Sequence, residues 1–391
     1  MANFSAFGSA LATVASKVVT PKKFIYNIAA LNNYASLYYF MAGRKMSEML
    51  RAGADVRARV KFTASSKAGW YEVPSEAHSP QDSQDGSWAI AYWCAHMAHE
   101  SWKDEELLIN SGGTTEGSLA EETWTQELFS KLQSLTTALH GSLAAGLWAK
   151  PNNVTMNGTD PKQPLSIPAY LNPMANGLFI EDAATTWASI HGLRPQDTHP
   201  RYKPNVSTYA DWTINSTSNL IFALSKACRL TTLIPPPKDQ EYFDPEGETS
   251  IERSQGVIFA SAHGVAKAEN LYRASQDRWA DYNDPAGNPR FKGTQFVHEA
   301  QLDTAAIHPD ASGYGTVLES STAAGLAGPR YYGVNAKYMK MYFHKARFME
   351  FLEPFRLSLT GWQQGVNTMA TMLCPDRSKH FLISPSANLY T

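Results

Sequence analysis

The sequence predicts an α+β fold, on the strength of three patterns. Residues 56–62 alternate between apolar and basic side chains, which is the two-residue period of a strand with one buried face. Leucines at positions 128, 132, 135, 139 and 143 recur at helical spacing. The C-terminal third contains further strand-like runs at 291–297 and 338–343. No fixed-period repeat appears, which disfavours solenoids and propellers.

Composition narrows the classes of protein that the chain can belong to. A length of 391 residues predicts two domains or one elaborated domain. The formal charge of −2 gives no strong overall field to attract nucleic acid or an anionic membrane. The three cysteines form no disulfide framework and have no metal-ligand spacing. No run of 18 apolar residues is present, so we expect no membrane association.

Residues 1–50 are predicted to form an N-terminal arm. Apolar residues recur at three- and four-residue spacing from Phe4 to Val18, which favours a short amphipathic helix. No basic region precedes them, so the segment lacks the pattern of a secretory signal, and we expect it to belong to the mature protein.

Residues 51–100 are predicted to form an extended two-stranded ribbon. The alternating run at 56–62 faces a second alternating run that starts at Trp88 and continues to Met97. The enclosed residues 64–87 are too many for a tight turn and surround a small island, Trp70 to Val73. A ribbon of this length cannot bury both faces within its own subunit, so we expect another copy of the chain to cover one of them.

A long helix is predicted from Leu119 to Ala149. Ser118 and Glu121 have the spacing of a capping box, and Lys150-Pro151 marks the end. Further along the chain we expect a helix that ends before the prolines at 235–237, a buried strand at 256–260 and a helix at 265–274. Residues 291–297 are predicted to be one strand with a glycine bulge, and 369–373 with 380–384 a terminal hairpin.

Enzymatic motifs are missing from the sequence. There is no phosphate-binding loop of the G-x-x-x-x-G-K-[ST] type and no G-x-S-x-G elbow. His96, His99 and Glu100 are the nearest approach to a metal site, but their spacing is not that of H-E-x-x-H. Structural polar contacts are the favoured reading, and a metal-assisted hydrolase remains an alternative. We therefore predict no catalytic, cofactor-binding or metal-binding residues.

The candidate contact residues lie in the ribbon. Arg57, Arg59 and Lys61 form the basic side of the first strand. They could bind phosphate, but near-neutral overall charge favours an acidic neighbouring subunit. With the loop residues Trp70, Tyr71 and Glu72 they are our candidate inter-subunit contacts.

A family resemblance rests on four sequence segments and on the predicted order of the arm, the ribbon, the long helix and the C-terminal strands. The four segments are Trp102 to Asn110, Phe291 to Val297, Tyr332 to Tyr338 and Cys374 to Lys379. The chain resembles tailed-bacteriophage major capsid proteins of the Hong Kong-97 fold. That resemblance implies an N-terminal arm at 1–50, an E-loop ribbon at 51–100 and a peripheral domain with its spine helix at 101–160. It further implies an axial domain at about 161–250, with 251–391 completing the axial domain and returning to the peripheral strands.

The resemblance also implies a function and a set of partners. The expected protein has no enzymatic turnover and assembles with copies of itself into hexamers and pentamers of an icosahedral phage head that encloses double-stranded DNA. A separate scaffolding protein, a portal, a decoration protein and non-specific contact with packaged DNA are the other expected partners. The expected location is the virion, after assembly in the host bacterial cytoplasm. An encapsulin-like compartment shell, which holds cargo enzymes, is the alternative within the same fold.

Overall fold

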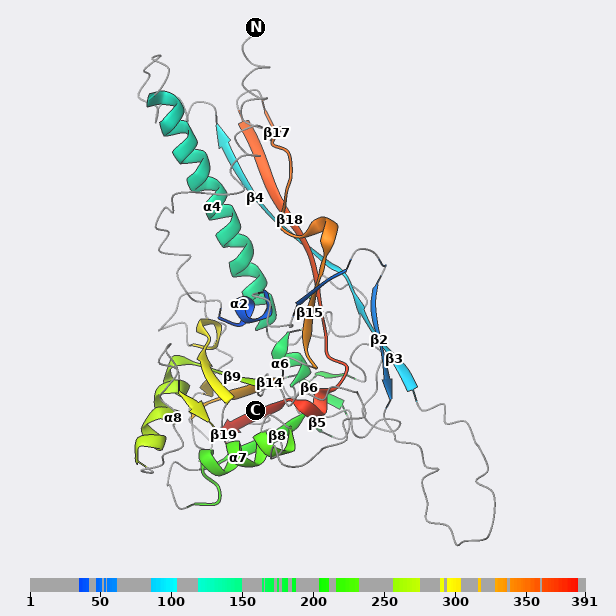
Figure 1. Ribbon diagram of the computed structural model, residues 1–391, viewed down its shortest axis with the longest axis vertical. Helices are drawn as coiled ribbons and strands as arrows, with labels where there is room; N and C mark the ends of the chain where they lie inside the picture. The colour runs from blue at the N-terminus through cyan, green and yellow to red at the C-terminus, as the bar shows by residue number, and fades with distance from the viewer. Residues whose placement is uncertain are drawn as a thin grey trace, which may run out of the picture.

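The fold is described from a computed structural model of the chain. The described residues are 35–41, 47–50, 53, 55–61, 86–103, 119–149, 164, 166–171, 174–175, 178–181, 185–187, 204–210, 216–231, 256–274, 289–291, 294–303, 316–317, 328–335, 338–358 and 361–385. Within them, two six-stranded sheets form the body of the molecule (Figure 1). The first sheet, which we call the spine sheet, lies with the long helix α4 in the upper part of the view, and the second sheet lies below with α7 and α8.

The spine sheet is built around one long strand, β18 (Gly361–Leu373). β4 (Cys94–Lys103) runs antiparallel along one edge of it, from the pair Gly361 and Lys103 to the pair Ala370 and Cys94. The opposite edge pairs with three shorter strands, β15 (Lys340–His344), β16 (Glu350–Phe351) and β17 (Phe355–Arg356). β1 (Ser47–Leu50) adds to β15 in parallel. The strand predicted near 338–343 is thus confirmed as β15.

The predicted long helix is confirmed as α4 (Leu119–Leu147), which covers one face of the spine sheet. Four of the five predicted leucines, at 132, 135, 139 and 143, are buried in one core with β18. Immediately after the helix, Trp148 is fully buried and packs edge-on against Phe259 at 5.6 Å and Tyr332 at 5.2 Å, both in the second sheet. The end of the helix therefore joins the two sheets. Ser118, of the predicted capping box, lies outside the described residues.

The second sheet has the strand order β10-β11-β9-β14-β19-β8. Its strands are β10 (Arg290–Phe291), β11 (Thr294–His298), β9 (Gly256–Ala260), β14 (Tyr331–Asn335), β19 (Phe381–Pro385) and β8 (Asn205–Tyr209). Every residue of β9 and β14 is buried, as expected for central strands covered on both faces. In β14, a Cβ on Gly333 would lie 2.2 Å from Cε1 of Phe381, so this position accepts no larger residue without repacking.

Two helices pack against the second sheet and share its core. α7 (Leu220–Leu230) starts at Asn219, whose side-chain oxygen accepts a hydrogen bond from the amide of Phe222 at 2.7 Å. It ends before the prolines at 235–237, as predicted. α8 (Ala262–Ala274) follows β9 directly and includes the predicted helix at 265–274. None of the helices in the described part of the chain has the length and apolar character needed to span a membrane.

The remaining elements are short and attach to these two sheets or stand beside them. They are α2 (Ala35–Met41), α6 (Ile167–Tyr170), the ribbon strands β2 (Asp55–Lys61) and β3 (Gly86–Tyr92), the small sheet of β5 (Met174–Ala175), β6 (Leu178–Glu181) and β7 (Thr185–Trp187), the pair β12 (Thr316–Val317) and β13 (Gly328–Pro329), and the 3₁₀ turns η2 (Ala300–Leu302), η3 (Lys345–Arg347) and η4 (Arg377–Lys379).

Two strand predictions are wrong. Residues 291–297 do not form one bulged strand, because Phe291 of β10 pairs antiparallel with Thr294 of β11 and the chain reverses between them. The predicted terminal hairpin does not form either, because β18 and β19 belong to different sheets. Both errors have the same source: local alternation identifies a strand but does not identify the strand it pairs with.

A buried polar junction explains why β18 and β19 separate. Arg377 in η4 is fully buried, and its Nε donates a hydrogen bond to the carbonyl of Tyr170 at 2.7 Å. The Tyr170 hydroxyl donates in turn to the carbonyl of Met372 at 2.8 Å. On the other side, Nδ1 of His380 accepts from the amide of Asn335 at 3.1 Å. These bonds fix the chain as it crosses from the spine sheet to the second sheet.

Candidate interaction surface

The ribbon of β2 and β3 is antiparallel, as predicted, and its inner face packs on the spine sheet. Val56 opposes Ala91 and Ala58 opposes Ala89 on this face. Val56, Ala89 and Ala91 are buried in a small core with Leu373 of β18. The ribbon ends at Tyr92, which is earlier than expected. From Cys94 onward the predicted second run becomes β4 and pairs with β18 instead of β2.

The opposite face of the ribbon is exposed in the single chain. We call it the outer ribbon face, and it consists of Asp55, Arg57, Arg59, Trp88, Ile90 and Tyr92. Trp88 is 54% exposed and Tyr92 is 49% exposed, although aromatic side chains of this size are usually well covered. Each lies opposite a charged residue of β2, Trp88 opposite Arg59 and Tyr92 opposite Asp55. Aromatic and arginine side chains are the types enriched where proteins bind one another.

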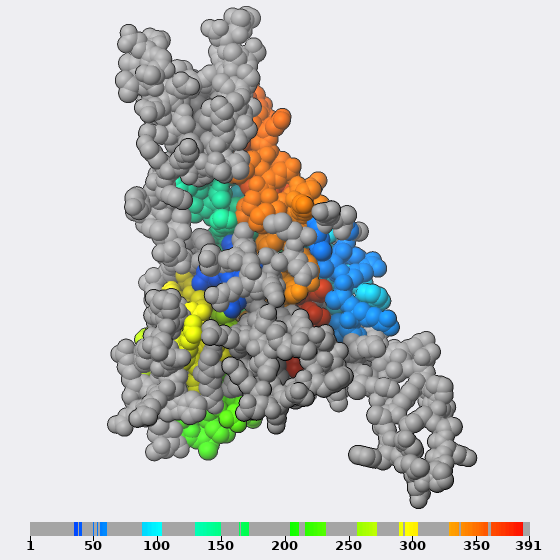
Figure 2. Space-filling view, viewed as in Figure 1, coloured from blue at the N-terminus to red at the C-terminus, as the bar shows by residue number. Residues whose placement is uncertain are grey.

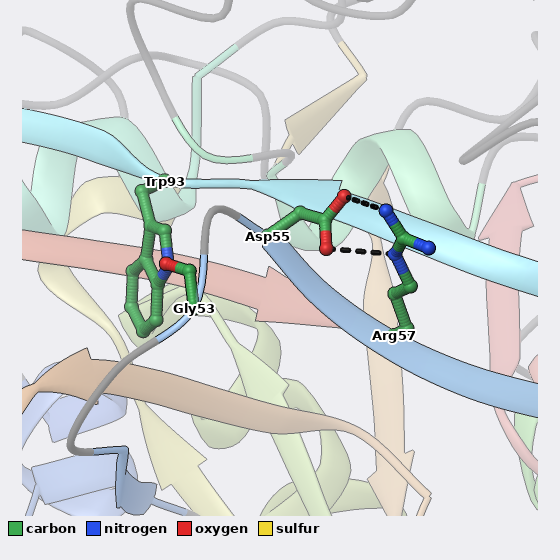
Figure 3. A network of polar contacts seen from close by, with 4 residues as sticks. All are labelled: Gly53, Asp55, Arg57 and Trp93. Atoms are coloured by element: carbon green, nitrogen blue, oxygen red, sulfur yellow. Dashed lines mark hydrogen bonds and ion pairs between the residues drawn. The ribbon is translucent and has the colours of Figure 1, made fainter.

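One of the two arginines on this face is held in a fixed position (Figure 3). Nε and a terminal nitrogen of Arg57 each donate to a different oxygen of Asp55, both at 2.8 Å. The hydrogen bonding between these two side chains lowers the pKa of the Asp55 carboxyl and raises the pKa of the Arg57 guanidinium. The Arg57 side chain is 59% exposed, so we assign the ion pair little stability and infer that it orients the guanidinium. Arg59 is exposed and has no ion-pair partner among the described residues.

The base of the ribbon is fixed by Trp93 (Figure 3). Its indole Nε1 donates to the carbonyl of Gly53 at 2.9 Å. Gly53 has a φ of +139°, a conformation that side-chain-bearing residues rarely adopt. The Trp93 ring also packs edge-on against His344 of β15, with 5.6 Å between ring centroids. The ribbon therefore leaves the spine sheet from an anchored base, and Figure 2 shows β2, in blue, at the margin of this face of the molecule.

The predicted contact residues have different outcomes. Arg57 and Arg59 lie exposed on the outer ribbon face, and Lys61 lies in β2 opposite Gly86. Trp70, Tyr71 and Glu72 lie outside the described residues. The role of all six in contacts between subunits stays a prediction. Trp88 and Tyr92 were not among the candidate contacts, although the predicted alternation placed them on one face of the second strand, and the structure shows both exposed there.

The histidines do not form a metal site. In β4, His96 and Glu100 share the face toward α4, whereas His99 is on the opposite face, since side chains alternate along a strand. His96 and Glu100 are also four residues apart, which is about 13 Å along a strand and too far for one ion. His96 instead contacts the hydroxyl of Ser142 in α4, and burial lowers its pKa. No group of three potential ligands occurs in the described part of the chain. The geometry therefore gives no support to the hydrolase alternative.

Comparison with solved structures shows the class of fold. A chain of the cyanophage A-1(L) capsid asymmetric unit matches with a TM-score of 0.55 at 10% identity, over 94% of this chain and 97% of that one. The chain therefore has a phage capsid fold, and the predicted α+β capsid fold is confirmed.

Other comparisons give weaker matches or none. A capsid chain of an empty GTA particle matches at 12% identity over 94% of this chain and 100% of that one, with a TM-score of 0.46. A chain from Mycobacterium phage Bobi matches at 10% identity over 95% and 98%, with a TM-score of 0.45. No protein-family model matches the sequence, and no curated protein does.

Proposed function

We propose that this chain is the major capsid protein of a tailed bacteriophage and that its function is to assemble with copies of itself into an icosahedral shell. The observation that carries the proposal is the capsid fold, which matches over 94% of the chain. The role proposed is structural and involves no cofactor. The outer ribbon face supports it, because an anchored, exposed aromatic and arginine surface is suited to cover by another subunit.

The contact proposed for this face is heterologous. In a closed ring of more than two subunits, each copy presents one surface and receives a different one. The outer ribbon face would be the presented surface, and Arg57, held by Asp55, and Arg59 would meet acidic groups on the neighbour. Shells of this kind would contain pentamers, which close the icosahedron at its vertices, and hexamers, which enlarge it between them.

The proposed domain layout follows the two sheets. The spine sheet with α4 would be the peripheral domain, and the second sheet with α7 and α8 the axial domain. The arm, predicted at 1–50, would end before β1, and the E-loop, predicted at 51–100, would end at Tyr92, because β1 and β4 belong to the spine sheet. A separate scaffolding protein, a portal and a decoration protein are the proposed partners during assembly in the bacterial cytoplasm. Contact with packaged double-stranded DNA would be non-specific.

Sedimentation of the full-length chain tests assembly at the proposed surface. We expect wild type to form large particles and Arg59→Glu to remain as small species, because charge reversal places like charges in the contact. Lys226→Glu, a matched reversal on the exposed surface of α7, should reduce assembly much less. Equal assembly of Arg59→Glu and wild type would remove this face from the proposal.

The contents of native particles separate the phage shell from a compartment shell. Particles purified from their natural source should hold double-stranded DNA that resists nuclease until the shell is opened. An enzyme in place of DNA would identify an encapsulin-like compartment and overturn the phage assignment while leaving the shell role intact.

A further inference from the structure

Glu299 is a buried carboxyl group at the junction of the two sheets. It follows β11 and precedes η2, and its side chain is 0% exposed. Oε2 accepts a hydrogen bond from the backbone amide of Ser36 in α2 at 2.6 Å. Oε1 has no hydrogen-bond partner among the described residues. A carboxylate that is fully buried and half satisfied is costly to keep ionised.

Ser36 connects this carboxyl to the end of the spine helix. The indole Nε1 of Trp148 donates to the hydroxyl oxygen of Ser36 at 2.9 Å. The cluster of Glu299, Ser36 and Trp148 therefore joins the second sheet, α2 and the end of α4. Close to it, Leu37 and Phe40 of α2 are buried in the core that α4 shares with the spine sheet.

Of the three parts of this cluster, α2 is the one that we infer to move, because it is a short helix outside both sheets. Glu299 is held by its own backbone, since its amide donates to the carbonyl of Ala260 in β9 at 3.0 Å. Trp148 is packed between rings of the second sheet. By contrast, α2 has seven residues and is held by the Ser36 contacts, by the buried side chains of Leu37 and Phe40, and by Tyr39, whose ring packs edge-on against Phe259 at 6.1 Å. Its departure would open Glu299 to water.

We propose that Glu299, Ser36 and Trp148 form a proton-controlled latch, which holds α2 against the core while Glu299 is protonated and favours its release when the carboxyl ionises. The inference concerns the single chain and goes beyond the proposed shell function, on which it does not depend.

The charged surroundings of Glu299 are limited in the described part of the chain. The neighbouring His298 acts on it electrostatically and lowers its pKa. Nε2 of His298 is itself bonded to Oδ2 of Asp303 at 2.7 Å, and Oδ1 of Asp303 accepts from the amide of Ala262 at the start of α8. The contacts from α2 and from the end of α4 are uncharged, being those of Ser36 and Trp148. His298 is thus the titratable group whose influence must be separated from that of Glu299.

The direction of the pH effect follows from the position of the carboxyl. Burial raises the pKa of Glu299 from 4.5 to about 7, against the opposing effects of hydrogen bonds from Ser36 and the backbone of Gln301 and of the charge of His298. A released α2 would return the group to its ordinary value in water. The docked state therefore binds the proton more tightly, so rising pH shifts the equilibrium toward release. Between pH 5 and pH 8 this linkage changes the docking equilibrium roughly 70-fold.

Hydrogen exchange of the α2 amides in the full-length chain tests the latch. After correction for intrinsic exchange rates, protection of residues 36–41 should fall roughly 70-fold from pH 5 to pH 8, while β9 stays protected. Glu299→Gln resembles the protonated form at every pH, so its α2 protection should not change with pH. His298→Gln is the matched control, and it should retain most of the wild-type fall.

Three results would overturn the latch. The first is a change in α2 protection between pH 5 and pH 8 of less than about threefold in wild type. The second is an equal fall in α2 protection in Glu299→Gln. The third is a fall in α2 protection that His298→Gln loses and Glu299→Gln keeps. If Glu299→Gln does not fold, Ser36→Ala decides the matter. This variant removes a hydroxyl that favours the ionised carboxylate of Glu299. The fall in α2 protection between pH 5 and pH 8 should therefore become larger than in wild type. A smaller fall in Ser36→Ala would contradict the proposal.

Discussion

Replacing Trp88 by alanine should weaken assembly more than it weakens folding. The side chain is 54% exposed in the single chain. A tryptophan offers on the order of 200 Å² of surface for burial, so about 110 Å² remains to be covered by a neighbour. At about 25 cal/mol per Å² this corresponds to roughly 3 kcal/mol per contact, or about a 100-fold change in affinity.

The assay is the total protein concentration at which particles first appear in sedimentation velocity. Trp88→Ala should raise that concentration about 100-fold, whereas Trp88→Phe, which keeps most of the apolar area, should raise it far less. Urea unfolding of unassembled Trp88→Ala should lose no more than about 2 kcal/mol, because only about 90 Å² of the side chain is covered before assembly. Assembly of Trp88→Ala at the wild-type concentration would refute the assignment of this face.

Further predictions concern the fold itself. Leu139→Ala empties a fully buried position of α4 and should cost about 2–5 kcal/mol in urea unfolding, whereas Ser134→Ala, on the exposed side of the same helix, should leave stability nearly unchanged. Gly333→Ala places a Cβ 2.2 Å from the Phe381 ring and should lower the melting temperature, with partial recovery when Phe381→Leu is added; a harmless Gly333→Ala would contradict the packing of β14 against β19. Burial lowers the pKa of His380 from 6.5 to about 3, so the folded state resists a proton that the unfolded state accepts, and stability should be lost as pH falls below 6.5. Relative to His380→Asn, wild type should lose roughly 2 kcal/mol between pH 6.5 and pH 4.5, and parallel pH profiles for the two proteins would count against this.

Periodicity predicted the long elements because each has a single buried stripe. The leucines of α4 repeat over several turns, so their spacing fits the period of a helix and not that of a strand. Four of them are buried in the structure, as expected. The alternation in β2 likewise placed Val56 inside and Arg57 and Arg59 outside. The same alternation in β3 placed Trp88 and Tyr92 on one face of the strand. Only the structure showed that both side chains are exposed.

Pairing and long-range polar contacts could not be predicted. β19 follows β18 after seven residues, which locally resembles a hairpin, yet β19 joins the second sheet. The residues that enforce this, Arg377 and His380, act through Tyr170 and Asn335, which are distant in sequence. Glu299 and Ser36 are separated by 263 positions, so no local pattern could have brought them together. The fold class was accessible from one sequence, whereas the junction between its sheets was not.

Electron microscopy of the purified full-length chain tests the central claim most directly. The capsid fold and the exposed outer ribbon face predict closed polyhedral particles of uniform size. A monodisperse small oligomer under all assembly conditions, including expression with the neighbouring genes of its source, would contradict a shell subunit.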